Sequence, residues 1–430
     1  MGLLLRIFIA IVFFLSFGGN VLAGEPMTLA ECLTVAMQNS AGVAVADSVY
    51  EAQQAELRSA RKSLYPALSY QYVYADQTDS SLVDSTYSST VSLDQPLYRG
   101  GGLVAGVAVK KLELAAADLG RRKSRGDLVL RVHQYYYGLL SSERLQAEAT
   151  QAFARLQAHR HDAQSFFDSG LIPRNDLLES EVREAQGEQD LLAASNQLSL
   201  ARSRLNLLLR RPADMPLAVV DCLISEARPV QWEDVLQLAL KNRVEIAQRE
   251  LAMDEAEKQI VIARADHLPA LDFSATYQKS GGDYLVVSPY AAPAEEKTAQ
   301  AVARWKFWTW GQGSDKVAAA RQRFRQSKER KVEIVDAVTL EVRKAYLDLL
   351  EADKNIAVTE KAIRAAEENY RINEARYQSR LNTSTEVLDA QSLLTKARTN
   401  YFVALHKYNL ALVTLDWVTG TLQTPGKDAS

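Results

Sequence analysis

Residues 59–74 read SARKSLYPALSYQYVY, and residues 262–277, which lie 203 positions later, read IARADHLPALDFSATY. The two stretches share an Ala-Arg pair, the tripeptide Pro-Ala-Leu and a closing tyrosine. The same shift aligns TLAECLTVAMQN at 28–39 with QWEDVLQLALKN at 231–242. Similarity at a fixed distance is the sequence signature of a repeated structural unit. The chain is therefore predicted to be a tandem duplication.

The later parts of the two copies align at a shift of 210, so the second copy carries seven extra residues between 278 and 306. Insertions collect in exposed loops, and GGDYLVVSPYAAPAEE in this interval has a loop-like composition. We expect a first repeat at 24–211, a linker at 212–230, a second repeat at 231–420 and a disordered tail at 421–430.

The N-terminus has the pattern of a cleavable secretory signal peptide. Arg6 precedes an apolar run over 7–17, and Val21-Leu22-Ala23 forms a small-residue cleavage site. The alternative is a membrane anchor, but a spanning helix needs about 20 apolar residues. We therefore predict that residues 1–23 are removed and that the protein is exported.

Composition narrows the class of protein. The chain has 430 residues with 47% apolar and 24% charged side chains, and its net charge of −3 argues against a nucleic-acid partner. Only 11 prolines and 20 glycines are present, which favours long helices. Cys32 and Cys222 are the only cysteines. They do not form a disulfide framework, but a single bridge between them is left open.

Each copy begins with a predicted helix, at 28–64 and 231–267, that ends before a proline. Apolar and polar residues then alternate with period two, which is typical of strands with two unlike faces. The predicted strands lie at about 67–77, 86–98, 270–279 and 298–310. Segments of about ten residues with one apolar face suit a tilted membrane strand.

Aromatic residues lie near the end of the second strand in each copy: Tyr98, Trp305, Trp308 and Trp310. Such side chains favour the interface between membrane and water. The alternative is a pair of soluble hairpins with aromatic cores.

A glycine cluster follows each pair of strands and precedes a long helical hairpin, over 101–210 in the first copy and 312–418 in the second. Residues 101–169 and 312–379 contain no proline. The returning helices carry apolar residues at three- and four-residue spacing, which predicts a helical partner along their length. In the second copy these residues are Val387, Ala390, Leu394, Ala397, Tyr401, Ala404, Tyr408, Ala411 and Leu415.

Two copies of the repeat supply four strands, and every strand edge inside a bilayer must be paired. Four strands are too few to close a barrel. Several chains are therefore expected to share one barrel of eight, twelve or sixteen strands.

The whole mature chain resembles the TolC family of outer-membrane efflux and secretion channels. The segments that carry this resemblance are YPALSYQYVY, QPLYRGGG, FFDSGLIPRNDLLESEV and RYQSRLNTSTEVLDAQSLLTKA. The resemblance implies a mainly α-helical fold with a small β part. It implies a tandem-repeat protomer that forms, as a homotrimer, a long α-helical barrel and a shared twelve-stranded transmembrane β-barrel. The partners implied are outer-membrane lipid, a periplasmic adaptor (membrane-fusion) protein and an inner-membrane pump or ABC exporter.

Four acids lie at the expected hairpin ends. Asp176 and Glu179 are three residues apart on one helical face, and the repeat places Glu386 and Asp389 at the equivalent positions. In an assembly of three chains these carboxylates would ring a narrow mouth, concentrate cations and repel anions. The alternative is that acids in a first helical turn simply complement the helix dipole.

The resemblance also implies a gate latch at Tyr377 and Asp176, one from each copy. The family has a basic residue where this sequence has Asn382, so a salt bridge made there is missing.

The sequence shows no pattern typical of a catalytic or metal-binding site. His159 and His161 are two residues apart and do not share a helical face, and no Cys/His spacing suits zinc. We predict no metal, no cofactor and no enzymatic activity. The leading hypothesis is a trimeric outer-membrane conduit for efflux or type I secretion, with a long periplasmic portion. The alternative is a periplasmic coiled-coil adaptor protein.

Overall fold

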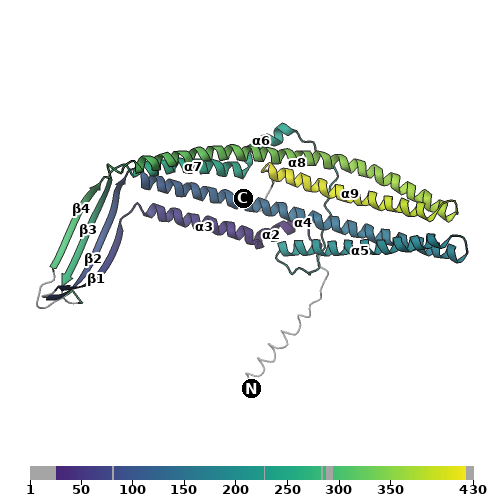
Figure 1. Ribbon diagram of the computed structural model, residues 1–430, viewed down its shortest axis with the longest axis horizontal. Coiled ribbons are helices and arrows are strands. Elements are labelled where there is room, and N and C mark those ends of the chain that lie inside the picture. The colour runs from purple at the N-terminus through teal and green to yellow at the C-terminus, as the bar shows by residue number, and fades with distance from the viewer. Residues whose placement is uncertain (1–25, 80–81, 227, 282–283, 287–293, 423–430) are drawn as a thin grey trace, which may run out of the picture.

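The computed structural model describes residues 26–79, 82–226, 228–281, 284–286 and 294–422. The predicted signal peptide and nearly all of the predicted tail lie outside these residues. Figure 1 shows an elongated molecule with a sheet at one end and long helices that run from it to two hairpin ends.

Four antiparallel strands form one sheet in chain order: β1 (Ala67–Asp79), β2 (Leu82–Arg99), β3 (Ala270–Gly281) and β4 (Ala294–Arg304). β4 differs from the predicted strand at 298–310, because it begins earlier and ends earlier. Its end has a simple cause. The last pair between β3 and β4 joins Ala270 to Arg304, and β3 begins at Ala270, so later residues have no partner strand in this chain.

Two short helices replace each of the predicted helices that precede the strands. They are α2 (Leu29–Asn39) and α3 (Ala41–Lys62) in the first repeat, and α6 (Trp232–Asn242) and α7 (Val244–Ala265) in the second. The breaks occur at Ser40 and Arg243, whose ψ angles of 118° and 122° are extended. The Ser40 side chain accepts a hydrogen bond from the backbone N–H of Val43, which starts α3.

The longest elements are α4 (Gly102–Asp168) and α8 (Gln312–Gln378), each of 67 residues. At 1.5 Å per residue each helix is about 100 Å long. Both follow a glycine with positive φ, Gly101 at 82° and Gly311 at 85°, which turns the chain out of the sheet. The chain returns along α5 (Arg174–Leu208) and α9 (Ser384–Val418), each of 35 residues.

Two apolar cores form where the short helices α2 and α6 meet the long hairpins. A fully buried tyrosine lies in each core and ties the linker between the repeats to a helix. Tyr136 donates its hydroxyl to the Val220 carbonyl at 2.6 Å, and Tyr408 donates to the Glu226 carbonyl at 2.6 Å. The linker is therefore held against both repeats.

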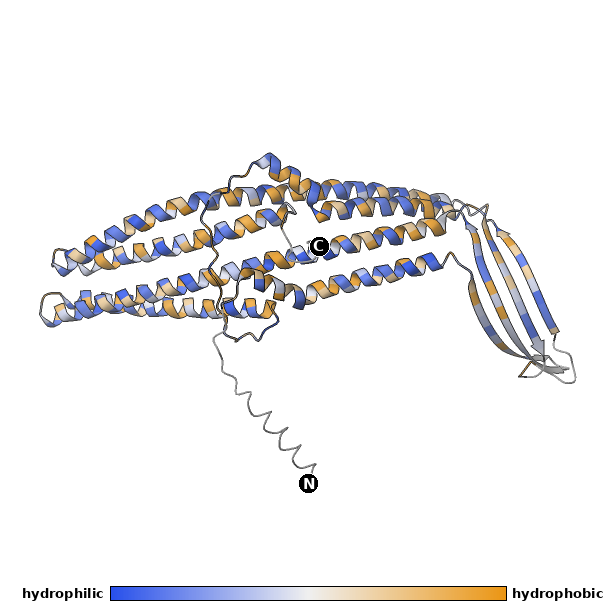
Figure 2. Cartoon of the chain, turned by 180° about the vertical axis from the view of Figure 1, so that it is seen from behind, coloured by the Kyte–Doolittle hydropathy of each residue, from blue (hydrophilic) through white to orange (hydrophobic). Residues whose placement is uncertain are grey.

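The two repeats pack on each other through α4, which contacts both α7 and α9. Within the described chain α8 has no comparable packing on α3 or α5, although repeat symmetry makes these its equivalent partners. Figure 2 shows apolar and polar residues interspersed along every helix. No helix among the described residues has a stretch both apolar and long enough to pass through a membrane.

Candidate functional site

The sheet has one mainly apolar face and one mainly polar face, because most strand pairs place like residues opposite one another. Leu68 faces Leu93 across β1 and β2, and Leu93 faces Ala275 across β2 and β3. Directly opposite residues of antiparallel strands point to the same face. The apolar face carries Leu68, Tyr70, Tyr72, Tyr74, Val91, Leu93, Leu271, Phe273, Ala275, Tyr277, Ala299, Ala301 and Ala303. The opposite face carries Ser69, Gln71, Thr90, Ser92, Ser274, Thr276, Thr298 and Gln300.

Much of the apolar face is exposed among the described residues, although Tyr72 on it donates its hydroxyl to the Tyr284 carbonyl at 2.6 Å. The side chains of Leu68 and Tyr70 are 75% and 66% exposed. Exposed apolar surface of this extent indicates contact with lipid or with another protein.

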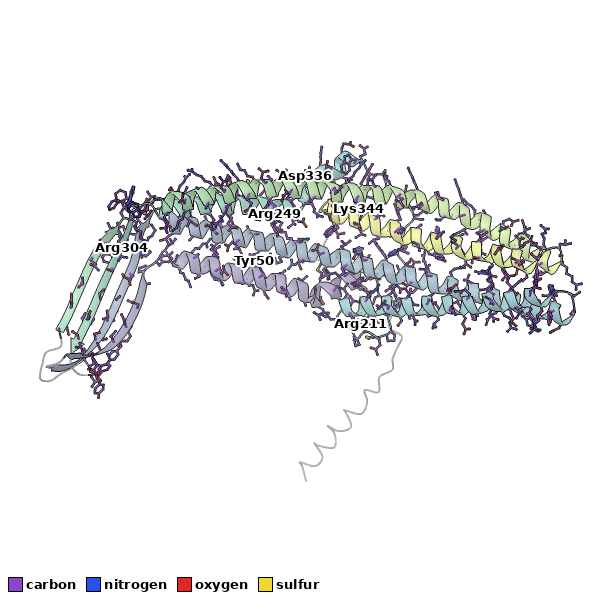
Figure 3. The ribbon with its side chains drawn as sticks, viewed as in Figure 1. Tyr50, Arg211, Arg249, Arg304, Asp336 and Lys344 are labelled. Atoms are coloured by element: carbon purple, nitrogen blue, oxygen red, sulfur yellow. The ribbon has the colours of Figure 1, made fainter. Side chains whose placement is uncertain are left out.

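The predicted interface aromatics lie at the end of the sheet that adjoins the helices. Tyr98 is within β2, whereas Trp305, Trp308 and Trp310 follow β4 and are 60%, 67% and 86% exposed. The Trp305 indole N–H donates to the His267 carbonyl at 2.9 Å. Arg304, labelled in Figure 3, marks the end of β4 from which they emerge.

At the opposite end of the molecule, the four predicted gate acids lie in the first two turns of two neighbouring helices, α5 and α9. Glu386 forms a capping box with Thr383, so part of its role is to start α9. Asp176 lies in the first turn of α5. Glu179 accepts a hydrogen bond from the Thr385 hydroxyl at 2.9 Å, and Asp389 is 64% exposed.

Asp389 lies 3.7 Å from the Arg183 guanidinium, and both side chains are well exposed. Such an ion pair contributes little to stability. The structure thus brings Glu179 and Asp389 to the junction between α5 and α9, and it leaves most of the Asp389 carboxylate open to solvent.

Tyr377, predicted as half of the latch, is buried at the end of α8. Its ring packs on His159 and Phe166, with centroid distances of 4.8 Å and 5.5 Å. No hydrogen bond joins the Tyr377 hydroxyl to Asp176 within the described chain. Burial raises the pKa of Tyr377, and the negative charges of Asp162 and Asp176 add to this effect.

A buried polar cluster beside Tyr377 was missed by the sequence analysis. The Nε2 atom of His159 lies 2.8 Å from the Ser384 hydroxyl, which lies 3.2 Å from the Ser180 hydroxyl. His159 is 7% exposed, and both serines are 1% exposed. Burial holds the pKa of His159 below its usual value. The cluster joins α4, α5 and α9, so it fixes the two hairpins to each other.

A second buried polar contact between the repeats involves the carboxylate of Glu148, which is 4% exposed on α4. It contacts Arg155 at 2.8 Å on the same helix and Arg398 at 3.3 Å on α9. A buried carboxylate needs such partners to remain charged. The heptad pattern gave no signal for it, because that pattern marks only apolar positions.

The bridge left open between Cys32 and Cys222 is not present, and both are free thiols. The Cys32 thiol points into the core from α2 and is fully buried, whereas Cys222 is exposed in the linker. Burial raises the pKa of Cys32 to about 11. Over the described ranges no group of three or more His, Cys, Asp or Glu side chains is arranged to hold a metal ion.

Comparison with known proteins identifies the family. The model of the outer membrane efflux protein family matches residues 33–209 and 235–421, one match for each repeat. The chain belongs to the outer membrane efflux protein family. The resemblance to TolC-type channels, which are outer-membrane efflux and secretion proteins, is therefore confirmed.

Two relatives of this outer membrane efflux protein are named as secretion proteins. The proteases secretion protein PrtF of Dickeya chrysanthemi is 24% identical, over 93% of this chain and 89% of the relative. The alkaline protease secretion protein AprF of Pseudomonas aeruginosa is 28% identical, over 57% of this chain and 54% of the relative.

The fold is that of a solved outer-membrane channel. The crystal structure of the Campylobacter jejuni CmeC outer membrane channel matches with a TM-score of 0.82 at 14% identity. The match covers 93% of this chain and 87% of the CmeC chain. The predicted fold class, mainly α-helical with a small β part, is confirmed.

Proposed function

We propose that three copies of this chain form one conduit that crosses the outer membrane and extends through the periplasm for efflux or type I secretion. The single observation that carries this proposal is the four-stranded sheet with one apolar face and two open edges.

The outer edges of β1 and β4 have no partner strand among the described residues. In lipid each unsatisfied backbone group costs several kcal/mol, so an open sheet is not stable there. Pairing β4 of one copy with β1 of the next removes both edges when the ring closes. Three copies, the number adopted from the TolC-type resemblance, give a twelve-stranded barrel.

The helical part supports the same assembly. α4 packs between α7 and α9, whereas α8 has a free side in the described chain. A second copy placed beside α8 supplies the equivalent of α7 and α9 through its α3 and α5. The helices then continue the barrel as a periplasmic tunnel about 100 Å long.

The hairpin ends form the periplasmic mouth in this proposal. Asp176, Glu179, Glu386 and Asp389 from three copies place up to twelve carboxylates there, which favours cations over anions. Tyr377 and Asp176 act as the latch between neighbouring hairpins. A periplasmic adaptor and an inner-membrane pump or ABC exporter dock at this end.

The names of PrtF and AprF favour an exported protein as the cargo, with a type I exporter as the inner-membrane partner. The alternative of a periplasmic adaptor fits less well. An adaptor carries one helical hairpin and lipoyl-like β domains, whereas this chain has two hairpins and a sheet with an apolar outer face.

The test is electrical. The full mature chain, purified in detergent, is added to a planar lipid bilayer, and single-channel current is recorded. We expect discrete conductance steps with a preference for cations, and none with detergent alone. A chain that inserts in the bilayer but gives no steps at any voltage would contradict the conduit.

A further inference from the structure

The second repeat has a longer connection between its strands than the first, at the end of the sheet away from the helices (Figure 1). β1 ends at Asp79 and β2 begins at Leu82, whereas β3 ends at Gly281 and β4 begins at Ala294. Within the longer connection the structure describes residues 284–286, a tyrosine, a leucine and a valine. The short connection of the first repeat has no room for a counterpart, so the strand pair itself does not require this segment.

A hydrogen bond places the segment against the apolar face of the sheet. Tyr72 belongs to that face, because it lies on β1 in alternation with the polar residues Gln71 and Val73 of the opposite face. Its hydroxyl donates to the Tyr284 carbonyl at 2.6 Å. The bond joins two segments 212 residues apart in the chain, so it depends on the folded position of residue 284.

A second contact, on a different strand, places the segment on the same side. Gly281 of β3 lies opposite Tyr87, which lies opposite Tyr74 of the apolar face. A Cβ added at Gly281 would lie 3.9 Å from Val286, which is ordinary van der Waals contact. Directly opposite residues of antiparallel strands point to the same face. The valine therefore packs over the apolar side of the sheet.

The valine is held firmly in this position. Val286 is only 4% exposed, and its φ of 54° is unusual for a β-branched residue. Such a conformation persists only where the surrounding structure determines it. The segment is thus fixed to the sheet by a buried side chain and by the bond from Tyr72.

The other two side chains of the segment point away from the protein. Tyr284 is 65% exposed and Leu285 is 62% exposed. They adjoin Tyr72 and Tyr74 of the apolar face, which are themselves 45% and 53% exposed. The segment therefore extends the exposed apolar surface. Continuous apolar surface of this kind indicates contact with lipid or with another protein.

The composition of the apolar face changes at the level of the segment. Lys279 lies in the same row as Tyr72, two strands away, and its Nζ atom is 4.0 Å from the Glu295 carboxylate. Two residues nearer the helices, Lys297 lies opposite Tyr277, with its Nζ atom 5.7 Å from the centre of the ring. Charged side chains at the end of an apolar band, with tyrosines beside them, are typical of the boundary between acyl chains and headgroups.

We propose that residues 284–286 dock on the outer leaflet of the membrane, where Tyr284 and Leu285 insert at the boundary between acyl chains and lipid headgroups. The inference rests on the proposed conduit, in which the apolar face meets lipid and the polar face lines the water-filled interior. The segment anchors the exit end of the barrel to the membrane surface. Because it packs on the outward face, these three residues take no space in the interior.

The test is the accessibility of a nitroxide spin label, measured on the full mature chain in vesicles of phosphatidylethanolamine and phosphatidylglycerol. The background is Cys222→Ser, and Cys32 stays unlabelled because it is fully buried. The label is placed at Leu285→Cys. Leu68→Cys is the reference on the apolar face, and Gln71→Cys is the matched control on the polar face.

Collisions of the label with oxygen, which concentrates in lipid, are compared with collisions with a water-soluble nickel chelate. We expect the ratio of oxygen to nickel collisions to be about fivefold or more higher at residue 285 than at residue 71. A label at 285 that resembles the one at 71, while the label at 68 lies in lipid, overturns the docking and leaves the conduit intact. A label at 285 shielded from both reagents indicates a protein contact and also overturns it. A label at 68 in water overturns the proposed function as well.

Removal of the hydrogen bond gives a second readout. Tyr72→Phe keeps the ring and deletes the donor to the Tyr284 carbonyl. We expect the label at residue 285 to gain rotational freedom and its collision ratio to fall toward that of residue 71. Tyr70→Phe is the control, because the Tyr70 hydroxyl bonds to Ser89 and not to the segment. Equal spectra in the two variants would overturn the placement of the segment by Tyr72.

Discussion

The Nε2 atom of His159 in the first repeat lies 2.8 Å from the hydroxyl oxygen of Ser384 in the second. Ser180 donates its hydroxyl to the Asp176 carbonyl at 3.0 Å, so it accepts from Ser384. Ser384 then accepts from the N–H at Nε2 of His159. A neutral imidazole with its proton on Nε2 is sufficient for this series of hydrogen bonds. The series ends at the backbone carbonyl of Asp176, a predicted gate residue.

Protonation of His159 should weaken this junction. Burial lowers its pKa below the usual 6.5, so the unfolded chain takes up a proton at a higher pH than the native chain does. The contribution of the neutral His159 side chain to the stability of the fold is complete above about pH 6.5 and is lost as the pH falls. The groups that face the ring and carry charge are Asp162 on α4 and Glu179 on α5.

We therefore expect His159→Gln to lower stability at pH 8 by about 1–2 kcal/mol and to reduce its decline on acidification. The measurement is the midpoint of thermal unfolding in detergent at pH 8 and pH 5. His161→Gln is the control, because that side chain is exposed on the same helix. Equal pH dependence in the wild type and the His159 variant would remove His159 from this role.

Glu148 should be the most costly acid to remove. Truncation to alanine leaves the guanidinium groups of Arg155 and Arg398 without their buried partner, and breaking such a pair costs about 3–5 kcal/mol. Glu367→Ala is matched to it, because Glu367 contacts the same Arg398 at 2.8 Å but is 45% exposed. We expect no more than about 1 kcal/mol there. Thermal unfolding compares the two, and equal losses would contradict the buried role of Glu148.

The acidic ring predicts a change in ion selectivity. Glu386→Gln with Asp389→Asn removes two charges per chain, while the glutamine can still cap α9. We expect the reversal potential in a salt gradient to move toward zero. The control is Glu329→Gln with Glu360→Gln, two exposed acids on α8 away from the hairpin end. Unchanged selectivity in the first variant would show that these acids do not act on passing ions.

Gly100 should resist substitution where the sheet meets the helices. Its φ is +60°, and an added Cβ would lie 2.9 Å from the Ala265 backbone. Gly100→Ala should lower the free energy of unfolding by about 2 kcal/mol or more. Gly106→Ala, within α4 and with open space around it, should instead gain about 0.5–1 kcal/mol. A stable Gly100→Ala protein would contradict the close approach of the chain to α7.

The sequence predicts the parts of the fold that follow a period. The alternation after Pro66 and Pro269 coincides with strands, and the glycine clusters coincide with the starts of α4 and α8. The heptad positions of α9 are mostly buried, as at Val387 and Leu394. These features depend on local spacing, which a single sequence displays.

Contacts between unlike positions of the repeats could not be predicted. His159 and Ser384 do not occupy equivalent positions in the two repeats. They are in contact because α4 packs against α9 near the hairpin ends. The break at Arg243 was missed for a similar reason. Its guanidinium bonds to Glu341 on α8 at 2.6 Å, a contact that depends on tertiary packing. The expected length of β4 presupposed a partner strand that one chain does not contain.

The mass of the native particle tests the central claim most directly. The full mature chain, extracted from membranes in mild detergent, is measured by native mass spectrometry. We predict a single species with three times the mass of one chain, because only copies that share their strand edges can satisfy the backbone in lipid. A stable particle of one chain that stays dispersed without detergent would contradict this account.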